Sequence, residues 1–301
     1  MTTDALSTPP AEVEINAALI GSLLRAQHPD LADLPIQIME AGWDNVMVRL
    51  GETHALRLPR RAAADPLILN EQKYLPELAL KLPLPIPAPI RTGTPQADYP
   101  FHWSVLKWLP GQAADLGPPD DTQARRLAHF LHTLHHLPIP APHPKNPHRD
   151  CPLLRKKRDT EKRMATIRAH SDLITPQVEQ AWQDGLGAEI DLPKSLIAGD
   201  VHARNVLTNN GKISAIIDWG DMCVGDPATD LASIWALFDM PVARQDAITA
   251  YKMSQETLAR AKGWAVFFGV ILYETGQKDT PRHAVMGQAT LQRITADGSK
   301  S

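Results

Sequence analysis

The chain has 301 residues, of which 43% are hydrophobic and 22% charged, and its 31 Lys and Arg against 34 Asp and Glu give a formal net charge of −3. This balance argues against a protein that binds nucleic acid through a basic surface, and no apolar run approaches the roughly 20 residues that span a bilayer. Residues 1–10 lack the basic and apolar regions of a secretory signal, and Cys151 and Cys223 supply neither a disulfide framework nor a thiolate metal site. We therefore expect a cytoplasmic protein with a full hydrophobic core in two lobes and with no membrane or nucleic-acid partner.

The first sixty residues are patterned as one helix followed by strands. Thr8-Pro9-Pro10 has the composition of a capped helix start, and the amphipathic run behind it ends before Pro29. Glycine-containing turns then separate apolar runs of strand length, which predicts an antiparallel meander over residues 36–39, 46–50 and 55–58.

A second helix and a further strand complete this part of the chain. Asp65-Pro66 is typical of a helix start, and Pro76 is expected to end or kink that helix. The proline-rich residues 83–89 are typical of an extended connector, which leads to a strand at residues 101–109.

Beyond Pro110-Gly111 the apolar periodicity becomes helical. One hairpin interrupts it, with strands at residues 206–208 and 213–217 joined by the turn Asn209-Asn210-Gly211, whereas Leu196-Ile197 is too short for a hairpin strand. The predicted fold class is therefore α+β, with a small β-rich lobe over residues 1–109 and a larger, mostly helical lobe over residues 110–301.

Three polar side chains flank this hairpin. Asp200 and Asn205 lie at the two ends of the loop before it, and Asp218 closes its second strand, so the three can converge on one face. A carboxylate that accepts a proton, together with a carboxylate and an amide oxygen for Mg²⁺, is what phosphoryl transfer requires. Taken singly, Asp200 could be a turn residue and Asp218 a strand-end cap, but their joint spacing favours Asp200 as the catalytic residue and Asn205 and Asp218 as metal ligands.

The same stretch resembles the aminoglycoside phosphotransferase family, small-molecule kinases that include macrolide phosphotransferases. Gly199, Asp200, His202 and Asn205 match the catalytic loop of that family, and Ile217-Asp218-Trp219-Gly220 matches its metal-binding element. Gly225-Asp226-Pro227 and Asp230-Leu231-Ala232 match a third motif in the expected order. The resemblance implies a protein-kinase-like two-lobe fold, with ATP or GTP as phosphoryl donor and Mg²⁺ as cofactor.

The resemblance also implies nucleotide contacts in the first lobe. The turn from Gly42 to Asn45 lies where the family has its nucleotide-positioning loop, although without that context it is an ordinary hairpin turn. Arg57, expected to be partly solvent-facing, stands where the family often has a lysine that contacts the phosphates, with Glu71 as its ion-pair partner. The main chain at Lys107 and Leu109 would bond the adenine edge.

One position departs from the family pattern. The histidine that precedes Gly-Asp in the family is Ala198 here, which removes a ring that would pack under the catalytic loop. We therefore keep two interpretations: a phosphotransferase that moves the γ-phosphate to a hydroxyl of a small molecule, such as an antibiotic or a related metabolite, or a catalytically impaired nucleotide-binding regulatory protein.

The acceptor is expected to be neutral or weakly cationic. Asp221, Asp239 and Glu274 are the carboxylates left over as candidate substrate contacts, too few for a polycationic aminoglycoside.

Four histidines at positions 129, 132, 135 and 136 share one predicted helix. His132 and His136 have a spacing that can hold a metal, but no third ligand is at hand locally, so a solvated helix face is favoured for this group.

Overall fold

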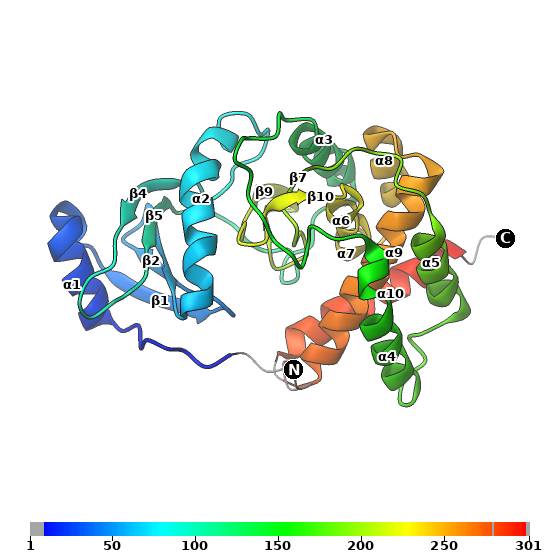
Figure 1. Cartoon of the computed structure of the whole chain (residues 1–301), viewed down its shortest axis with the longest axis horizontal. Coiled ribbons are helices and arrows are strands. Elements are labelled where there is room, and N and C mark those ends of the chain that lie inside the picture. The colour runs from blue at the N-terminus through cyan, green and yellow to red at the C-terminus, as the bar shows by residue number, and fades with distance from the viewer. Residues whose placement is uncertain (1–8, 279, 299–301) are drawn as a thin grey trace. The chain divides into compact units, whose positions relative to one another are not determined.

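The computed structural model describes residues 9–278 and 280–298, and the chain divides into two compact units, Met1–Pro110 and Gly111–Ser301 (Figure 1). Among the described residues, no helix combines the length and apolar character needed to cross a membrane. Each unit has its own sheet or sheets and its own buried side chains.

A five-stranded antiparallel sheet with the order β1-β2-β3-β5-β4 forms the centre of the first unit. The strands are β1 (Ile36–Ala41), β2 (Asn45–Leu50), β3 (His54–Pro59), β4 (Pro89–Gly93) and β5 (Trp103–Lys107). The first three form the predicted meander, and β2 pairs with β3 in a register that sets Met47 opposite Arg57.

One helix lies on each side of this sheet (Figure 1). The apolar face of α1 (Ala17–Gln27) packs with alternate strand residues in one core cluster that includes Leu23, Val48 and Leu56. Successive strand residues point to opposite faces, so Arg57 faces away from that cluster and meets α2 (Asp65–Leu78), where it pairs with Glu71.

The helix boundaries in this unit differ from the prediction. Thr8 lies outside the described residues, and α1 begins only after Asn16, whose side chain accepts a hydrogen bond from the Leu19 amide at 3.0 Å. Asn16 therefore caps the helix as a typical N-cap residue does. Pro76 does not end α2, which continues to Leu78. The structure also adds β4, which the proline-rich pattern of the connector concealed.

The second unit is organised around the long helix α9 (Gln255–Gly276), which contacts α4, α5, α6, α7 and α10. The other helices are α3 (Ala124–His135), α4 (Lys157–Arg168), α5 (Pro176–Gly187), α6 (Ala228–Leu231), α7 (Ser233–Leu237), α8 (Pro241–Tyr251) and α10 (Pro281–Gly298). Short 3-10 helices occur at Pro29–Leu31, Ala62–Ala64, Asp121–Gln123 and Leu153–Lys156.

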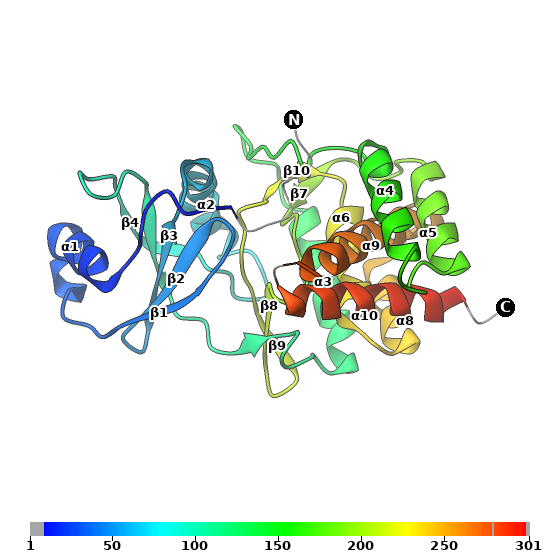
Figure 2. The ribbon, with the colours of Figure 1, turned by 90° about the horizontal axis from the view of Figure 1, so that it is seen from below.

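Two small sheets stand beside these helices (Figure 2). The predicted hairpin is β8 (Val206–Asn209) and β9 (Lys212–Ile216), and β6 (Gln112–Ala113) pairs with β8. Asn210 and Gly211 both have positive φ, as a tight hairpin turn requires. The segment around Leu196-Ile197 is also a strand, β7 (Ser195–Ile197), because it pairs with β10 (Cys223–Gly225) from a distant part of the sequence.

Candidate active site

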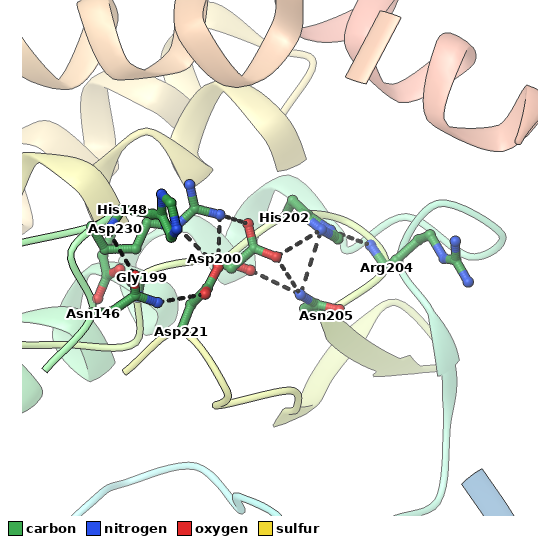
Figure 3. Close-up of polar contacts among 10 residues, drawn as sticks. Asn146, His148, Gly199, Asp200, His202, Arg204, Asn205, Asp221 and Asp230 are labelled. Carbon is green, nitrogen blue, oxygen red and sulfur yellow. Dashed lines mark hydrogen bonds and ion pairs between the residues drawn. The ribbon is translucent and has the colours of Figure 1, made fainter. Parts of the chain in front are cut away.

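The loop that links β7 to β8 has a backbone that only glycine allows at its second position. Gly199 has φ of +85°, and a Cβ there would lie 2.5 Å from the backbone oxygen of Asp221. The amides of Ala198 and Gly199 each donate a hydrogen bond of 2.8 Å to the carboxylate of Asp230 in α6. Gly199 and Asp230 are labelled in Figure 3. The loop is thus anchored by its main chain directly before Asp200.

Asp230 is fully buried and receives a third contact from α3, where His135 Nε2 lies 3.2 Å from its Oδ2. The other ring nitrogen of His135 lies 2.8 Å from the Tyr251 hydroxyl. This corrects the expectation of a solvated histidine face for His135, which is 5% exposed, while His129 on the same helix and His136 at its C-cap are exposed. The helix turns His135 inward because a buried carboxylate there requires a partner.

Asp200 lies at the centre of a polar cluster (Figure 3). Its Oδ1 accepts a hydrogen bond from Arg149 Nη2 at 3.0 Å, and its Oδ2 lies 3.4 Å from His202 Nε2. Burial acts to raise the pKa of Asp200, but the charges of His202 and Arg149 outweigh it and hold that pKa below its ordinary value. Asp200 is therefore an ionised carboxylate at neutral pH.

Asn205 is oriented by Asp200. Its Nδ2 donates to the Asp200 backbone oxygen at 2.9 Å and lies 3.3 Å from Asp200 Oδ2, which turns the amide oxygen away from that carboxylate. The Ile217 amide donates to the Asn205 backbone oxygen at 2.8 Å, so Asp218 follows directly beside Asn205.

Asp218 is exposed and has φ of +59°, a left-handed conformation that aspartate adopts more readily than most residues. One amide oxygen and one carboxylate suit Mg²⁺, which keeps waters and phosphate oxygens in the rest of its shell. The donor set of Asn205 and Asp218 thus fits this cation.

Asp221, one of the predicted substrate contacts, already has partners. Arg149 Nε donates to its Oδ2 at 3.0 Å, Arg149 Nη2 lies 2.7 Å from the same oxygen, and Asn146 Nδ2 donates to its Oδ1 at 2.7 Å. Burial raises the pKa of Asp221, an effect that Arg149 opposes. The structure brings Asp221 to Asp200 through this shared arginine.

The other two predicted substrate carboxylates are paired elsewhere in the second unit. Asp239 accepts a hydrogen bond from Arg293 Nε of α10 at 2.7 Å, and Glu274 of α9 pairs with Arg163 of α4. Among the described residues, no hydrogen bond or ion pair joins either carboxylate to Asp200 or Asp221. Of the three predicted substrate carboxylates, Asp221 is the one that shares a partner, Arg149, with Asp200.

The predicted nucleotide contacts of the first unit are spread along its sheet. Asn45 pairs with Pro59 at one end of β3, and Lys107 pairs with His54 at the other end. Gly42 and Asn45 close the β1–β2 hairpin, in which the Gly42 amide donates to the Asn45 backbone oxygen at 2.8 Å. Arg57 Nε lies 2.9 Å from Glu71 Oε2. Lys107 ends β5 with an exposed side chain, and Leu109 follows in irregular chain.

Arg57 is less accessible than the sequence suggested, at 7% exposure, because α2 covers this face of β3. The expectation of a partly solvent-facing residue was therefore wrong. Glu71 is 2% exposed, so the two charges form a buried pair whose members depend on each other for stability.

Several residues of the cluster carry no local sequence signal. Arg149 and Asn146 come from the irregular segment between α3 and the turn at Leu153, and His283, at the start of α10, lies 2.9 Å from Arg204 Nη1 through its Nε2. Only the fold brings these side chains to the loop, so a search by motif passes over them.

Both the sequence and the fold of this chain resemble those of known proteins. A sequence profile described as "Phosphotransferase enzyme family" matches residues 35–264, which is well over half of the chain. The chain belongs to this phosphotransferase family. It is also 25% identical over 250 residues to the uncharacterized protein YcbJ of Bacillus subtilis (strain 168), covering 75% of this chain and 78% of that protein.

Solved structures of two antibiotic phosphotransferases share the fold of this phosphotransferase family member. The GDP and kanamycin complex of APH(2")-IIIa has a TM-score of 0.65 at 16% identity, covering 93% of this chain and 99% of that one. The macrolide 2'-phosphotransferase MphH from Brachybacterium faecium, an apoenzyme, has a TM-score of 0.58 at 20% identity, covering 92% and 98%. The protein-kinase-like α+β fold predicted from the sequence is thereby confirmed.

Proposed function

We propose that this protein transfers the γ-phosphate of ATP or GTP to a hydroxyl group of a small molecule, with Asp200 as the catalytic residue. The observation that carries the proposal is the arrangement of the β7–β8 loop: an ionised Asp200 is held by an anchored main chain, next to an Asn205 whose amide oxygen faces away from it. A positioned base beside a magnesium ligand is the arrangement that phosphoryl transfer needs.

In the proposed reaction, Asp200 accepts a hydrogen bond from the acceptor hydroxyl and orients its oxygen toward the γ-phosphorus. As the new O–P bond forms, the bond between the γ-phosphorus and the bridging oxygen of the nucleotide breaks, and the hydroxyl proton passes to the Asp200 carboxylate. Mg²⁺, when held by Asn205 and Asp218, would neutralise charge on the phosphates. General-base groups of this kind commonly contribute about 10²- to 10⁴-fold.

The nucleotide contacts proposed in the first unit are Gly42 and Asn45 of the hairpin, the cation of Arg57, and the main chain at Lys107 and Leu109. Glu71 holds the Arg57 side chain from α2, which would keep its guanidinium in one orientation. In this assignment Arg57 supplies the positive charge for which related enzymes often use lysine.

Antibiotics are one class of acceptor to consider, because kanamycin and a macrolide are named with the two solved relatives. For this chain we favour a neutral or weakly cationic compound, such as a macrolide or a metabolite with an alcohol group. Each carboxylate expected to bind a polycation, at positions 221, 239 and 274, is already paired with an arginine. We also propose that the protein acts in the cytoplasm, where the nucleotide is abundant.

A screen tests the proposed activity. The full chain is incubated with Mg²⁺, ATP or GTP, and a panel of hydroxyl compounds, and ADP or GDP release is followed by a coupled assay. We expect acceptor-dependent nucleotide consumption that Asp200→Asn abolishes and that an equivalent change at an exposed aspartate of the first unit, Asp33→Asn, leaves intact. Acceptor-dependent consumption that survives Asp200→Asn contradicts the assignment.

The alternative, a nucleotide-binding regulatory protein, rests on Ala198 in place of the family histidine. The hydrogen bonds from Ala198 and Gly199 to Asp230, and the contact of His135 with that carboxylate, fix the loop without the missing ring. This favours the enzyme. Nucleotide binding with no turnover across the whole panel would favour the regulatory protein instead.

A further inference from the structure

Arg149 occupies the side of Asp200 that faces away from Asn205. Its guanidinium bonds Asp200 through Nη2 and Asp221 through Nε and Nη2, with distances between 2.7 and 3.0 Å. The side chain is 15% exposed, and the two carboxylates are 25% and 29% exposed. One cation therefore pairs with both Asp200 and Asp221.

A second contact fixes the orientation of Arg149. Its guanidinium carbon lies 5.1 Å from the centroid of the Phe268 ring on α9, and Lys156 Nζ lies 5.5 Å from the adjacent Phe267 ring. A planar guanidinium held by an aromatic ring and by two carboxylates loses little further freedom when it bonds a ligand.

The hydrogen bonds that Arg149 donates to these carboxylates use Nε and Nη2. Within the described parts of the chain, Nη1 has no hydrogen-bond partner, so its two N–H groups remain as donors beside the catalytic carboxylate. Guanidinium N–H groups only donate, so they bond oxygen atoms and repel ammonium groups. The charge next to Asp200 thus has the opposite sign to the one a cationic acceptor would need.

We propose that Arg149 is the acceptor-specificity residue of this enzyme and that the acceptor is an uncharged or anionic hydroxyl compound that presents an oxygen atom to Arg149 Nη1. The proposal rests on the proposed function, because it concerns the acceptor side of the Asp200 site. Arg149 also positions the Asp200 carboxylate by bonding its Oδ1, which leaves Oδ2 on the side of Asn205.

Kanamycin, a polycation, is the probe that shows whether the site beside Asp200 attracts or repels positive charge. Its binding to the full-length protein is measured by isothermal titration calorimetry at 50 and 300 mM salt, without nucleotide, so the result does not depend on turnover. We expect weak, salt-insensitive binding to the wild type. Arg149→Gln uncovers Asp200 and Asp221 and should tighten kanamycin binding at least tenfold at the lower salt, because oppositely charged groups attract more strongly when unscreened.

Three further variants keep this test decisive. Arg149→Lys keeps the charge and should bind kanamycin as weakly as the wild type does. The double variant R149Q/D221N removes the second carboxylate and should lose most of the gain. Arg163→Gln, which uncovers Glu274 in the same unit, is the matched control and should change kanamycin affinity less than threefold.

The outcomes separate this proposal from the proposed function. If Arg149→Gln stays within threefold of the wild type, or if the wild type itself binds kanamycin tightly and with strong salt dependence, the assignment of Arg149 is overturned. If Arg149→Gln does not fold, Arg149→Lys and the wild-type salt series still decide it. A chain that shows the expected charge preference but no transfer to any acceptor retains the specificity assignment and refutes the kinase activity.

Discussion

Asp200 is fixed from three directions, by the anchored main chain before it, by Asn205 after it and by Arg149 beside it. Asp200→Asn keeps the size of the side chain and removes the negative charge. We expect the transfer rate to fall by about 10²- to 10⁴-fold while the Kd for nucleotide changes little, because this side chain is assigned to the acceptor and not to the nucleotide. Single-turnover kinetics and equilibrium nucleotide binding measure the two quantities, and an equal loss of both would contradict the role.

His283 provides a pH-dependent test of the same neighbourhood. Burial, followed by the charges of Arg204 and His202, lowers the pKa of His283 from 6.5 to about 4. Between these values the unfolded chain binds more protons than the folded one, so this contribution to stability is present above pH 6.5 and is lost as the pH falls toward 4.

We therefore expect the Tm of the wild type to fall more steeply than that of His283→Gln as the pH is lowered through this window. The glutamine can still accept a hydrogen bond from Arg204 but does not titrate. His129→Gln, at an exposed position on α3, is the control and should follow the wild type. Parallel curves for the wild type and His283→Gln would show that His283 titrates normally.

The local part of the site could be predicted from the sequence, and the distant part could not. Asp200, Asn205 and Asp218 fall within one hairpin and its flanking loops, so their spacing already implied that they converge. Arg149 and His135 reach the same loop from more than fifty residues away, and only tertiary packing makes them neighbours of Asp200 and Asp230.

At the scale of elements, helix α3 contacts Asp230, which anchors the β7–β8 loop, through one histidine. His135 contacts Asp230 and the Tyr251 hydroxyl of α8, and both partners are buried. His135→Phe fills a similar volume but gives up both contacts, which leaves buried polar groups short of partners. Such losses cost about 1–3 kcal/mol each.

We expect His135→Phe to lower the free energy of unfolding by about 1–3 kcal/mol for each lost contact. The transfer rate should also fall, because Asp230 then anchors Ala198 and Gly199 less firmly. Chemical denaturation and steady-state assays measure the two effects. The matched control is His129→Phe on the exposed side of α3, which should stay within about 0.5 kcal/mol. A variant His135→Phe as stable as the control would show that the loop does not depend on α3.

Elements with strong periodicity were predictable, and elements defined by pairing were not. The meander β1–β3 and the hairpin β8–β9 alternate apolar residues with turn residues, which local chemistry specifies. β7 and β10 have three residues each and form only because their pairing partner is brought to them. Their sequences alone do not contain that information, and the same holds for β4 at the sheet edge.

At the scale of the whole molecule, the proposed nucleotide contacts are distributed over both units, with Arg57 in one and Asp218 in the other. A ligand that binds the folded chain raises its stability by about 2.7 kcal/mol at 100 times its Kd. The rise in Tm caused by Mg-nucleotide therefore measures contributions from either unit in the intact protein. Asp218→Asn loses the carboxylate charge that would hold the cation, so its Tm rise should be smaller and should no longer depend on Mg²⁺.

The role of Arg57 is tested with a single and a double variant. Arg57→Gln alone removes the cation that pairs with the buried Glu71 and should destabilise the first unit by about 3–5 kcal/mol. In the double variant R57Q/E71Q both charges are removed together, so the Tm without ligand should recover toward that of the wild type. The Tm rise with Mg-nucleotide should stay small in this variant, since the phosphates have lost the Arg57 charge. A double variant that recovers the full nucleotide-dependent rise would show that Arg57 serves only the stability of the fold, and Arg57→Lys, which keeps the charge, should retain most of the rise.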